Sequence, residues 1–226
     1  MKATKSTMLS MLFALALASC KDDESPAPKA RVSIQPTVNK QVTNKSGRTA
    51  AANDLVFTSG SIMITEVEFS AGRVDNGLAV NVIHEQEATI DFATGTITPA
   101  VIVEVPPGQY ESIYLGIEIR DEDATPGIVI EGTYTNSNNQ AIPVRFEFNS
   151  GEVFEAEADL AALDANQNVV AKISFDPQYW FATISAEQLD NATKVGGKIL
   201  VNATTNVAIY SVVVERLDDA TDAVFQ

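Results

Sequence analysis

The stretch Ile113-Tyr114-Leu115-Gly116-Ile117-Glu118-Ile119 places a branched apolar side chain at every second position. Successive side chains of a β-strand point to opposite faces, so this alternation predicts a strand with one face in a core and the other largely in water. The same period of two recurs from residue 55 onward, at Ile62 and Ile64; Leu78, Val80 and Val82; Val101, Val103 and Val105; Ile128 and Ile130; Val144, Phe146 and Phe148; and Val169, Ala171, Ile173 and Phe175.

Clusters of turn-forming residues separate these predicted strands. Many short strands with this punctuation favour an all-β fold, an antiparallel β-sandwich, over a fold in which strands alternate with helices. The length allows one such domain, which we expect over residues 54–226. The turn clusters are Asp75-Asn76-Gly77, Pro106-Pro107-Gly108, Thr125-Pro126-Gly127, Asn136-Ser137-Asn138-Asn139 and Asp164-Ala165-Asn166.

Two segments near the C-terminus favour helices instead. Ser185, with Gln188 three residues later, has the pattern of a capping box and predicts one short helix. Thr205 or Asn206 is placed to cap a longer C-terminal helix, although the β-branched run Val212-Val213-Val214 leaves a strand as the alternative. The longer helix is favoured because four residues share one helical face: Val207, Tyr210, Val214 and Leu217.

A proline-glycine turn precedes the strand at Ile113. The segment Val105-Pro106-Pro107-Gly108-Gln109-Tyr110 resembles the proline-glycine-x-tyrosine corner of prealbumin-like sandwich domains, in which the tyrosine folds back on the sandwich. Over roughly residues 54–226 the chain is similar to an uncharacterised family of Bacteroidota lipoproteins with a prealbumin-like fold. That resemblance implies the fold but no catalytic residue. It also draws on Glu131-Gly132-Thr133-Tyr134, Ile142-Pro143-Val144-Arg145-Phe146, Phe175-Asp176-Pro177, Trp180-Phe181 and residues 206–210.

The N-terminal residues have the pattern of a lipoprotein signal peptide. Lys2 and Lys5 precede an apolar run, Met8 to Ala18, that is too short for a spanning helix of about 20 residues. The run ends in Leu17-Ala18-Ser19-Cys20, which resembles the lipobox of the lipoprotein signal peptidase. We therefore expect residues 1–19 to be removed and Cys20 to receive the lipid. Cys20 is the only cysteine, so the chain forms no intramolecular disulfide.

Lys21-Asp22-Asp23-Glu24 follows the cysteine directly. It resembles the export signal that sends Bacteroidota lipoproteins to the outer face of the outer membrane. The resemblance implies a lipid-anchored protein that faces the cell exterior, with the membrane as one partner. The alternative is a solvated charge run of the kind found in any lipoprotein tether.

Residues 20–53 are predicted to be the lipidated cysteine and a flexible tether, because they are rich in Pro, Lys, Ser, Thr and Asn without a persistent strand or helix period. Arg48 lies in the polar segment Ser46-Gly47-Arg48-Thr49-Ala50. Fimbrillin-type pilins of the same phylum are lipoproteins cut after an arginine at a similar depth, so Arg48 is a candidate processing site. The alternative is an ordinary basic residue in a linker.

The charge of the chain limits its partners. It has 30 acidic and 15 basic residues, for a formal charge of −15. Loss of residues 1–19 removes two lysines and no acid, which makes the charge −17. Such a surface repels phosphates, so we expect no nucleic-acid partner.

Few residues suggest catalysis or metal binding. His84 is the only histidine, and one His without a thiol cannot form the usual zinc site or a standard triad. Gly196-Gly197-Lys198 lacks P-loop spacing and predicts a hairpin turn. Asp121-Glu122-Asp123 is a weak Ca²⁺ candidate, as are Asp218, Asp219 and Asp222, but neither group has EF-hand spacing. We expect no cofactor.

Tyr179-Trp180-Phe181 is the densest aromatic stretch. It is either a platform for a sugar or peptide ligand, or a plug at one end of the sandwich after the strand that ends at Phe175. The sequence favours the plug.

Three functions remain open. The leading prediction is a non-enzymatic binding or adhesion module on the cell surface, held by lipidated Cys20 and directed at a glycan or protein ligand. The first alternative is a fimbrillin-like pilus subunit processed near Arg48 that exchanges its C-terminal strand between subunits. The second alternative is an enzyme that acts on surface polysaccharide, which needs two acids in an aromatic cleft.

Overall fold

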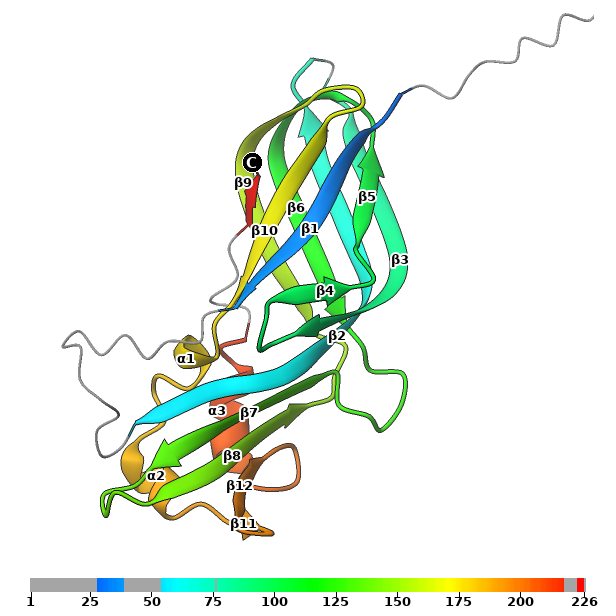
Figure 1. Ribbon diagram of the computed structural model, residues 1–226. Helices are drawn as coiled ribbons and strands as arrows, with labels where there is room; N and C mark the ends of the chain where they lie inside the picture. The colour runs from blue at the N-terminus through cyan, green and yellow to red at the C-terminus, as the bar shows by residue number, and fades with distance from the viewer. Residues whose placement is uncertain (1–27, 39–53, 76, 218–222, 226) are drawn as a thin grey trace, which may run out of the picture.

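The computed structural model describes residues 28–38, 54–75, 77–217 and 223–225 (Figure 1). These residues form an all-β sandwich with three short helices. The strands build a smaller and a larger sheet. The larger sheet bends away from the smaller one, so that it forms a sandwich with the smaller sheet at one end of the molecule and packs with the helices at the other end (Figure 1). We refer to these ends as the sandwich lobe and the helical lobe.

The sandwich lobe packs a four-stranded sheet on part of the larger sheet (Figure 1). Ring contacts join the two layers: Phe154 lies 5.1 Å from Phe175, and Phe69 lies 6.5 Å from Phe225, between centroids. The four-stranded sheet has the order β13 (Ala223–Phe225), β10 (Asn168–Phe175), β1 (Ala30–Val38), β5 (Ile102–Val105). The opposing layer contains β9 (Val153–Leu163), β6 (Gly108–Ile119), part of β2 (Leu55–Arg73), β3 (Ala79–Asp91) and β4 (Thr96–Thr98).

The long strand β2 joins the two lobes (Figure 1). Its C-terminal part pairs with β3 and β6, whereas residues 55–62 pair with β7 in the helical lobe. The helical lobe continues the sheet through β7 (Ile128–Thr135), β8 (Ala141–Phe148), β12 (Lys198–Val201) and β11 (Lys194–Val195), and holds α1 (Pro177–Trp180), α2 (Ala186–Asp190) and α3 (Val207–Val214).

The alternating pattern predicted the inward faces correctly. The apolar residues of the stretch 113–119 are at most 1 % exposed, because β6 lies inside the sheet with its apolar face on the core. Leu78 is an exception: it precedes β3 and is 63 % exposed. Other predicted inward residues that are buried are Ile62, Ile64, Val101, Val103, Val105, Ile128, Ile130, Val144, Phe146, Phe148, Val169, Ala171, Ile173 and Phe175.

The proline-glycine corner also forms as expected. Tyr110 is fully buried at the start of β6, and its hydroxyl donates a hydrogen bond to the carbonyl oxygen of Pro106. The buried ring packs edge-on against Phe69 of β2, with centroids 5.6 Å apart. The corner therefore fixes the angle at which β6 follows β5.

The prediction of a tether through residue 53 was wrong for residues 30–38. These residues form β1, which lies between β10 and β5, parallel to β10 and antiparallel to β5. Ala30, Val32 and Ile34 alternate inward and are at most 4 % exposed. The domain therefore begins before residue 54. Its sheets are not purely antiparallel, since β8 and β12 also pair in parallel.

Both predicted helices form, with two corrections. Ser185 and Gln188 make the capping box of α2 reciprocally. Asn206 precedes α3 in a left-handed conformation, and its side chain does not cap the helix. The predicted face of α3 is only partly correct: Leu217, just after the helix, is fully buried and Tyr210 and Val214 are partly buried, but Val207 is 49 % exposed and Ile209 and Val213 are buried instead. The helix packs on the buried face of the sheet, where its Tyr210 ring contacts Phe146 and Phe148, and these tertiary contacts decide which residues of α3 are buried.

Among the described residues, no helix is long and apolar enough to cross a membrane.

Candidate functional site

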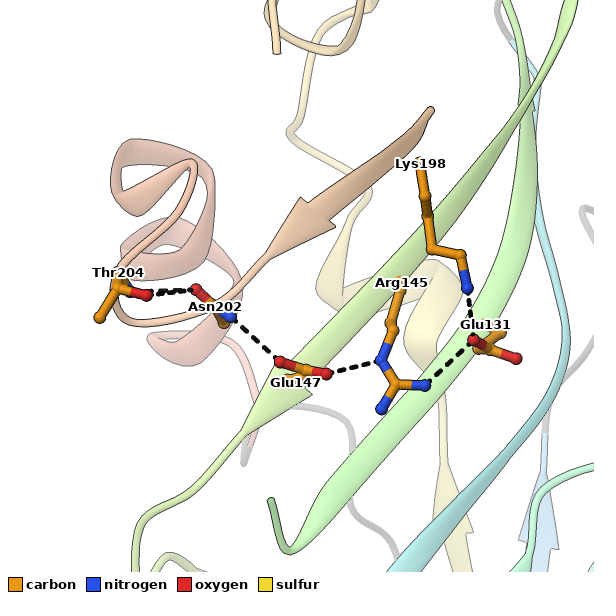
Figure 2. Close-up of polar contacts among 6 residues, drawn as sticks. All are labelled: Glu131, Arg145, Glu147, Lys198, Asn202 and Thr204. Atoms are coloured by element: carbon orange, nitrogen blue, oxygen red, sulfur yellow. Dashed lines mark hydrogen bonds and ion pairs between the residues drawn. The ribbon is translucent and has the colours of Figure 1, made fainter. Parts of the chain in front are cut away.

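The outer face of the helical-lobe sheet holds a group of charged and amide side chains. Because side chains alternate along β8, Phe146 and Phe148 point to the buried face while Arg145 and Glu147 point away from it. Neighbouring strands add polar residues beside them. The polar cluster consists of Glu131 on β7, Arg145 and Glu147 on β8, Lys198 on β12, and Asn202 just after β12 (Figure 2).

These side chains form a continuous chain of contacts across three strands (Figure 2). Glu131 Oε1 accepts from Lys198 Nζ at 2.8 Å and from Arg145 Nη1 at 3.1 Å. Arg145 Nε donates to Glu147 Oε1 at 2.6 Å, and Asn202 Nδ2 donates to Glu147 Oε2 at 3.0 Å. Each carboxylate is thus held by two donors in a fixed orientation.

Asn202 is itself fixed by the turn that follows β12. Its Oδ1 accepts hydrogen bonds from the Thr204 amide at 3.0 Å, the Thr204 hydroxyl at 3.1 Å and the Thr205 amide at 2.8 Å. Side-chain bonds of this kind are typical of asparagine turns. The far end of the polar cluster is therefore ordered by local backbone geometry.

The charges of the polar cluster balance, with two carboxylates and two cations. Hydrogen bonds from Lys198 and Arg145 lower the pKa of Glu131. Burial raises the pKa of Glu147, but hydrogen bonds from Asn202 and Arg145 outweigh that effect and lower it. All four ionic side chains remain partly exposed, so water screens these pairs and their contribution to stability is small.

A pocket of about 170 Å³ opens beside the polar cluster, where the parallel strands β8 and β12 end. Glu147 forms part of its wall, and Tyr210 of α3 forms another part. The ring of Tyr210 is held by Phe146 and Phe148, at centroid distances of 6.2 and 6.4 Å. The remaining lining residues are Ala124, Pro126, Asn149, Asn202, Ala203 and Thr204.

A second hollow lies over β2, β3 and the end of β6 and is strongly acidic. Burial first, and then the neighbouring carboxylates of Glu66, Asp121 and Glu122, raise the pKa of Glu118 there. Within the described part of the chain, no group of three or more potential ligand side chains is arranged to hold a metal ion.

The predicted Ca²⁺ candidate at Asp121-Glu122-Asp123 is partly occupied by a cation of the chain itself. Arg120 Nη2 lies 2.9 Å from Asp123 Oδ2, and Arg120 Nε lies 3.2 Å from Glu122 Oε2. The hydrogen bonds from Arg120 and Thr125 hold the pKa of Asp123 far below its usual value. Two of the three carboxylates are therefore engaged by arginine.

The aromatic stretch is mainly a plug and not a ligand platform. Trp180 is 1 % exposed and lies 6.0 Å from Phe154 of the sandwich lobe, between centroids. Phe181 is 5 % exposed and packs 4.9 Å from Phe57 in the helical lobe. Buried rings cannot stack on a ligand, so the platform prediction was wrong for both residues. Tyr179 alone is exposed, and the Arg216 guanidinium lies 4.2 Å from its ring centroid.

Two other sequence predictions are located by the structure. The segment Val82-Ile83-His84-Glu85 predicts that His84 ends a strand, but His84 lies in the middle of β3, with Nε2 at 3.0 Å from Gln86 Oε1. Gly196 and Gly197 form the turn between β11 and β12, with φ of 60° and 82°. These positive values suit glycine and confirm the predicted hairpin.

Several predicted sites lie outside the described residues. They are the lipobox residues Leu17, Ala18 and Ser19, the lipidation site Cys20, the export signal Lys21 to Glu24, the candidate processing site Arg48, and the acidic residues Asp218, Asp219 and Asp222.

Sequence reasoning missed the polar cluster. Glu131, Arg145 and Glu147 occupy outward positions of strands that were correctly predicted, so for these three the signal was present in the alternation, whereas the strand that carries Lys198 was not predicted. The sequence did not reveal that Glu131 and Lys198, 67 residues apart, meet across the sheet.

Comparisons with family models, curated proteins and solved structures found nothing that matches the chain. The fold therefore defines the class, an all-β sandwich protein, and the function rests on the physical properties of its surface.

Proposed function

We propose that this protein is a lipid-anchored binding module of the bacterial cell surface, held to the outer membrane by Cys20, that presents its helical lobe to a ligand. The lipobox at Leu17 to Cys20 and the acidic signal at Lys21 to Glu24 support the anchoring part of this proposal. Resemblance to prealbumin-like lipoproteins of Bacteroidota supports the same location.

The place where β1 begins supports the proposal that the helical lobe faces away from the membrane. β1 begins at the end of the sandwich lobe that is remote from α2, β11 and β12 (Figure 1). A lipid attached on the N-terminal side of β1 therefore leaves the helical lobe farthest from the membrane. The polar cluster and the pocket lie in that distal lobe.

Lipid labelling and surface digestion test the anchoring. Cells that produce the chain should incorporate labelled fatty acid into it, and Cys20→Ser should abolish the label. Protease added to intact cells should digest the unchanged protein but spare a variant with Lys21 to Glu24 replaced by alanine. Continued labelling of Cys20→Ser would refute the anchor.

A pilus subunit remains the second candidate because of the position of β1. β1 pairs with β10 along residues 31–38 and with β5 along residues 30–33, so it occupies the middle of the four-stranded sheet. Arg48 follows β1 in the sequence and precedes β2. Cleavage there would leave β1 held only by noncovalent contacts, and a strand from a second copy could replace it.

The N-terminus of the mature protein separates the two candidates. Mass spectrometry of the protein from its native membrane, after cross-linking, should find Cys20 retained if the binding-module proposal holds. A cross-linked ladder of the protein that begins at Thr49, lost in Arg48→Gln but retained in the control Arg31→Gln, would instead establish the pilus subunit.

A further inference from the structure

We infer that the pocket at the ends of β8 and β12 binds one uncharged saccharide unit. This inference rests on the proposed function and gives its ligand a chemical class. It depends on the balance of charge around the pocket, on the hydrogen-bonding groups in its wall and on its size.

The charge around the pocket disfavours ionic ligands. Glu147 is the carboxylate among the residues that line the pocket, and its Oε1 lies 2.6 Å from Nε of Arg145. The other two ionic members of the polar cluster, Glu131 and Lys198, pair with each other at 2.8 Å. An anion would therefore face a carboxylate, and a cation would have to compete with an arginine already in place.

The wall of the pocket is rich in hydrogen-bond acceptors. Each carboxylate oxygen of Glu147 accepts one bond within the polar cluster and has a second lone pair. The Thr204 hydroxyl donates to Asn202, which leaves its oxygen to accept. Asn149 uses its Nδ2 to bond the Asp123 carbonyl oxygen, and its own amide oxygen takes no part in that bond. Such acceptors suit a ligand that offers many hydroxyl donors.

These acceptors are held in place before any ligand binds. Asn202 is fixed by three hydrogen bonds from its own turn, and Glu147 is fixed between Asn202 and Arg145 (Figure 2). Preorganised groups lose little conformational entropy on binding. Ala124, Pro126, Ala203 and the ring of Tyr210 supply the apolar wall against which the C–H face of a sugar can pack.

The size of the pocket limits the ligand to one ring. About 170 Å³ corresponds to roughly six water molecules, at roughly 30 Å³ for each in the liquid. A contact of that size with a dozen ligand atoms gives a Kd on the order of millimolar. Many copies of this lipoprotein on one cell surface together hold a polymeric glycan through many weak contacts.

Saturation-transfer NMR on the purified, lipidated protein in detergent tests this inference. The probes are glucose, galactose, mannose and N-acetylglucosamine, with ethanolamine and methyl phosphate as charged controls whose C–H protons report binding. At least one sugar should receive saturation, with a Kd on the order of millimolar. Ethanolamine and methyl phosphate should receive none.

Two matched variants locate the binding. Ala203→Trp fills the pocket from an exposed position and should weaken sugar binding at least about tenfold. Ala208→Trp places the same side chain at an exposed position of α3 outside the lining and should leave binding unchanged. A circular-dichroism spectrum like that of the unchanged protein shows that each variant folds.

Three results would overturn the inference: no saturation of any sugar, sugar binding that survives Ala203→Trp, or stronger binding of ethanolamine or methyl phosphate. None of them concerns the anchor. Fatty-acid labelling at Cys20 and digestion on intact cells report on the proposed surface location separately.

Discussion

The hydroxyl of Tyr134, on β7, donates a hydrogen bond of 3.0 Å to the carboxylate of Asp190 at the end of α2. The same hydroxyl lies 3.2 Å from the carbonyl oxygen of Ala186, in the first turn of that helix. Tyr134 is fully buried, and the two residues lie 56 positions apart in the sequence. One phenol therefore fixes the short helix α2 to the sheet.

Removal of that hydroxyl should destabilise the protein. Tyr134→Phe keeps the ring but leaves Asp190 without this buried donor, and we expect a loss of about 1–3 kcal/mol in the free energy of unfolding. Urea denaturation measures this loss in the free energy of unfolding. Tyr114→Phe is the control, because the Tyr114 hydroxyl bonds Glu155 at an exposed site and should cost less than about 1 kcal/mol. Equal losses in the two variants would contradict this role for Tyr134.

The same contact should make stability depend on alkaline pH. Burial, and then the hydrogen bond to Asp190, raise the pKa of Tyr134 to about 12. The folded state therefore favours the neutral phenol. Its contribution is complete below the unfolded pKa of about 10 and is lost as the pH rises through about 12. Because burial also raises the pKa of Tyr110 and Tyr210, tyrosinate absorbance should show a late ionisation whose amplitude falls by one tyrosine in Tyr134→Phe. Ionisation of all tyrosines near pH 10 would disprove the shift.

A glycine permits the close approach of β7 to β2. A Cβ added to Gly132 would lie 2.2 Å from the carbonyl oxygen of Val56 and 2.9 Å from the Cα of Phe57. These are backbone atoms of a central strand, so Gly132→Ala should cost about 1–3 kcal/mol or more. In the control Gly72→Ala, the nearest atom is 3.6 Å away. Thermal denaturation compares the two, and equal melting temperatures would show that β7 can shift freely.

The aromatic plug predicts opposite behaviour for two adjacent residues. Trp180→Ala opens a cavity between the lobes and should cost about 3–5 kcal/mol. Tyr179→Ala removes only an exposed contact with Arg216, worth about 0.5–1 kcal/mol. Denaturant unfolding followed by circular dichroism measures both. A ligand platform would give the reverse, with Trp180→Ala stable and defective only in binding.

The polar cluster should weaken in acid. The pKa values of Glu131 and Glu147 are lowered, so the ionised carboxylates stabilise the folded state above their unfolded value of about 4.5. That stabilisation is lost as the pH falls through the lower folded pKa values. Glu147→Gln should therefore destabilise the protein slightly at neutral pH and less at pH near 3. If the loss of stability in Glu147→Gln were larger in acid than at neutral pH, the expected direction of the pH dependence would be wrong.

The strand faces were predictable because they depend on local spacing. In β6, β8 and β10 the inward residues are the apolar ones at every second position, since burial of one face dominates the energetics of each strand. β1 has the same alternation at Ala30, Val32 and Ile34. It was overlooked because Pro36 and the polar residues around it favoured a tether, and only pairing with distant β10 makes it a strand.

The candidate site was not predictable in the same way. Arg145 and Glu147 are ordinary outward residues of a strand until Lys198 and Asn202 arrive from β12. The aromatic stretch was ambiguous for a related reason. Whether Trp180 faces a ligand or Phe154 depends on how the two lobes meet, which no local pattern specifies.

Local patterns along the chain were enough to predict the two-residue period of the strands, the Pro106 to Tyr110 corner, the Gly196-Gly197 hairpin and the capping box at Ser185. Each depends on residues within a few positions of one another, so the interaction forms wherever the segment folds. By contrast, the place of β1 in the core and the meeting of Glu131, Glu147 and Asn202 on one surface depend on contacts between distant segments. Those contacts join residues 55 to about 140 positions apart, and their formation depends on packing the whole sandwich to offset the entropy of closing such long loops.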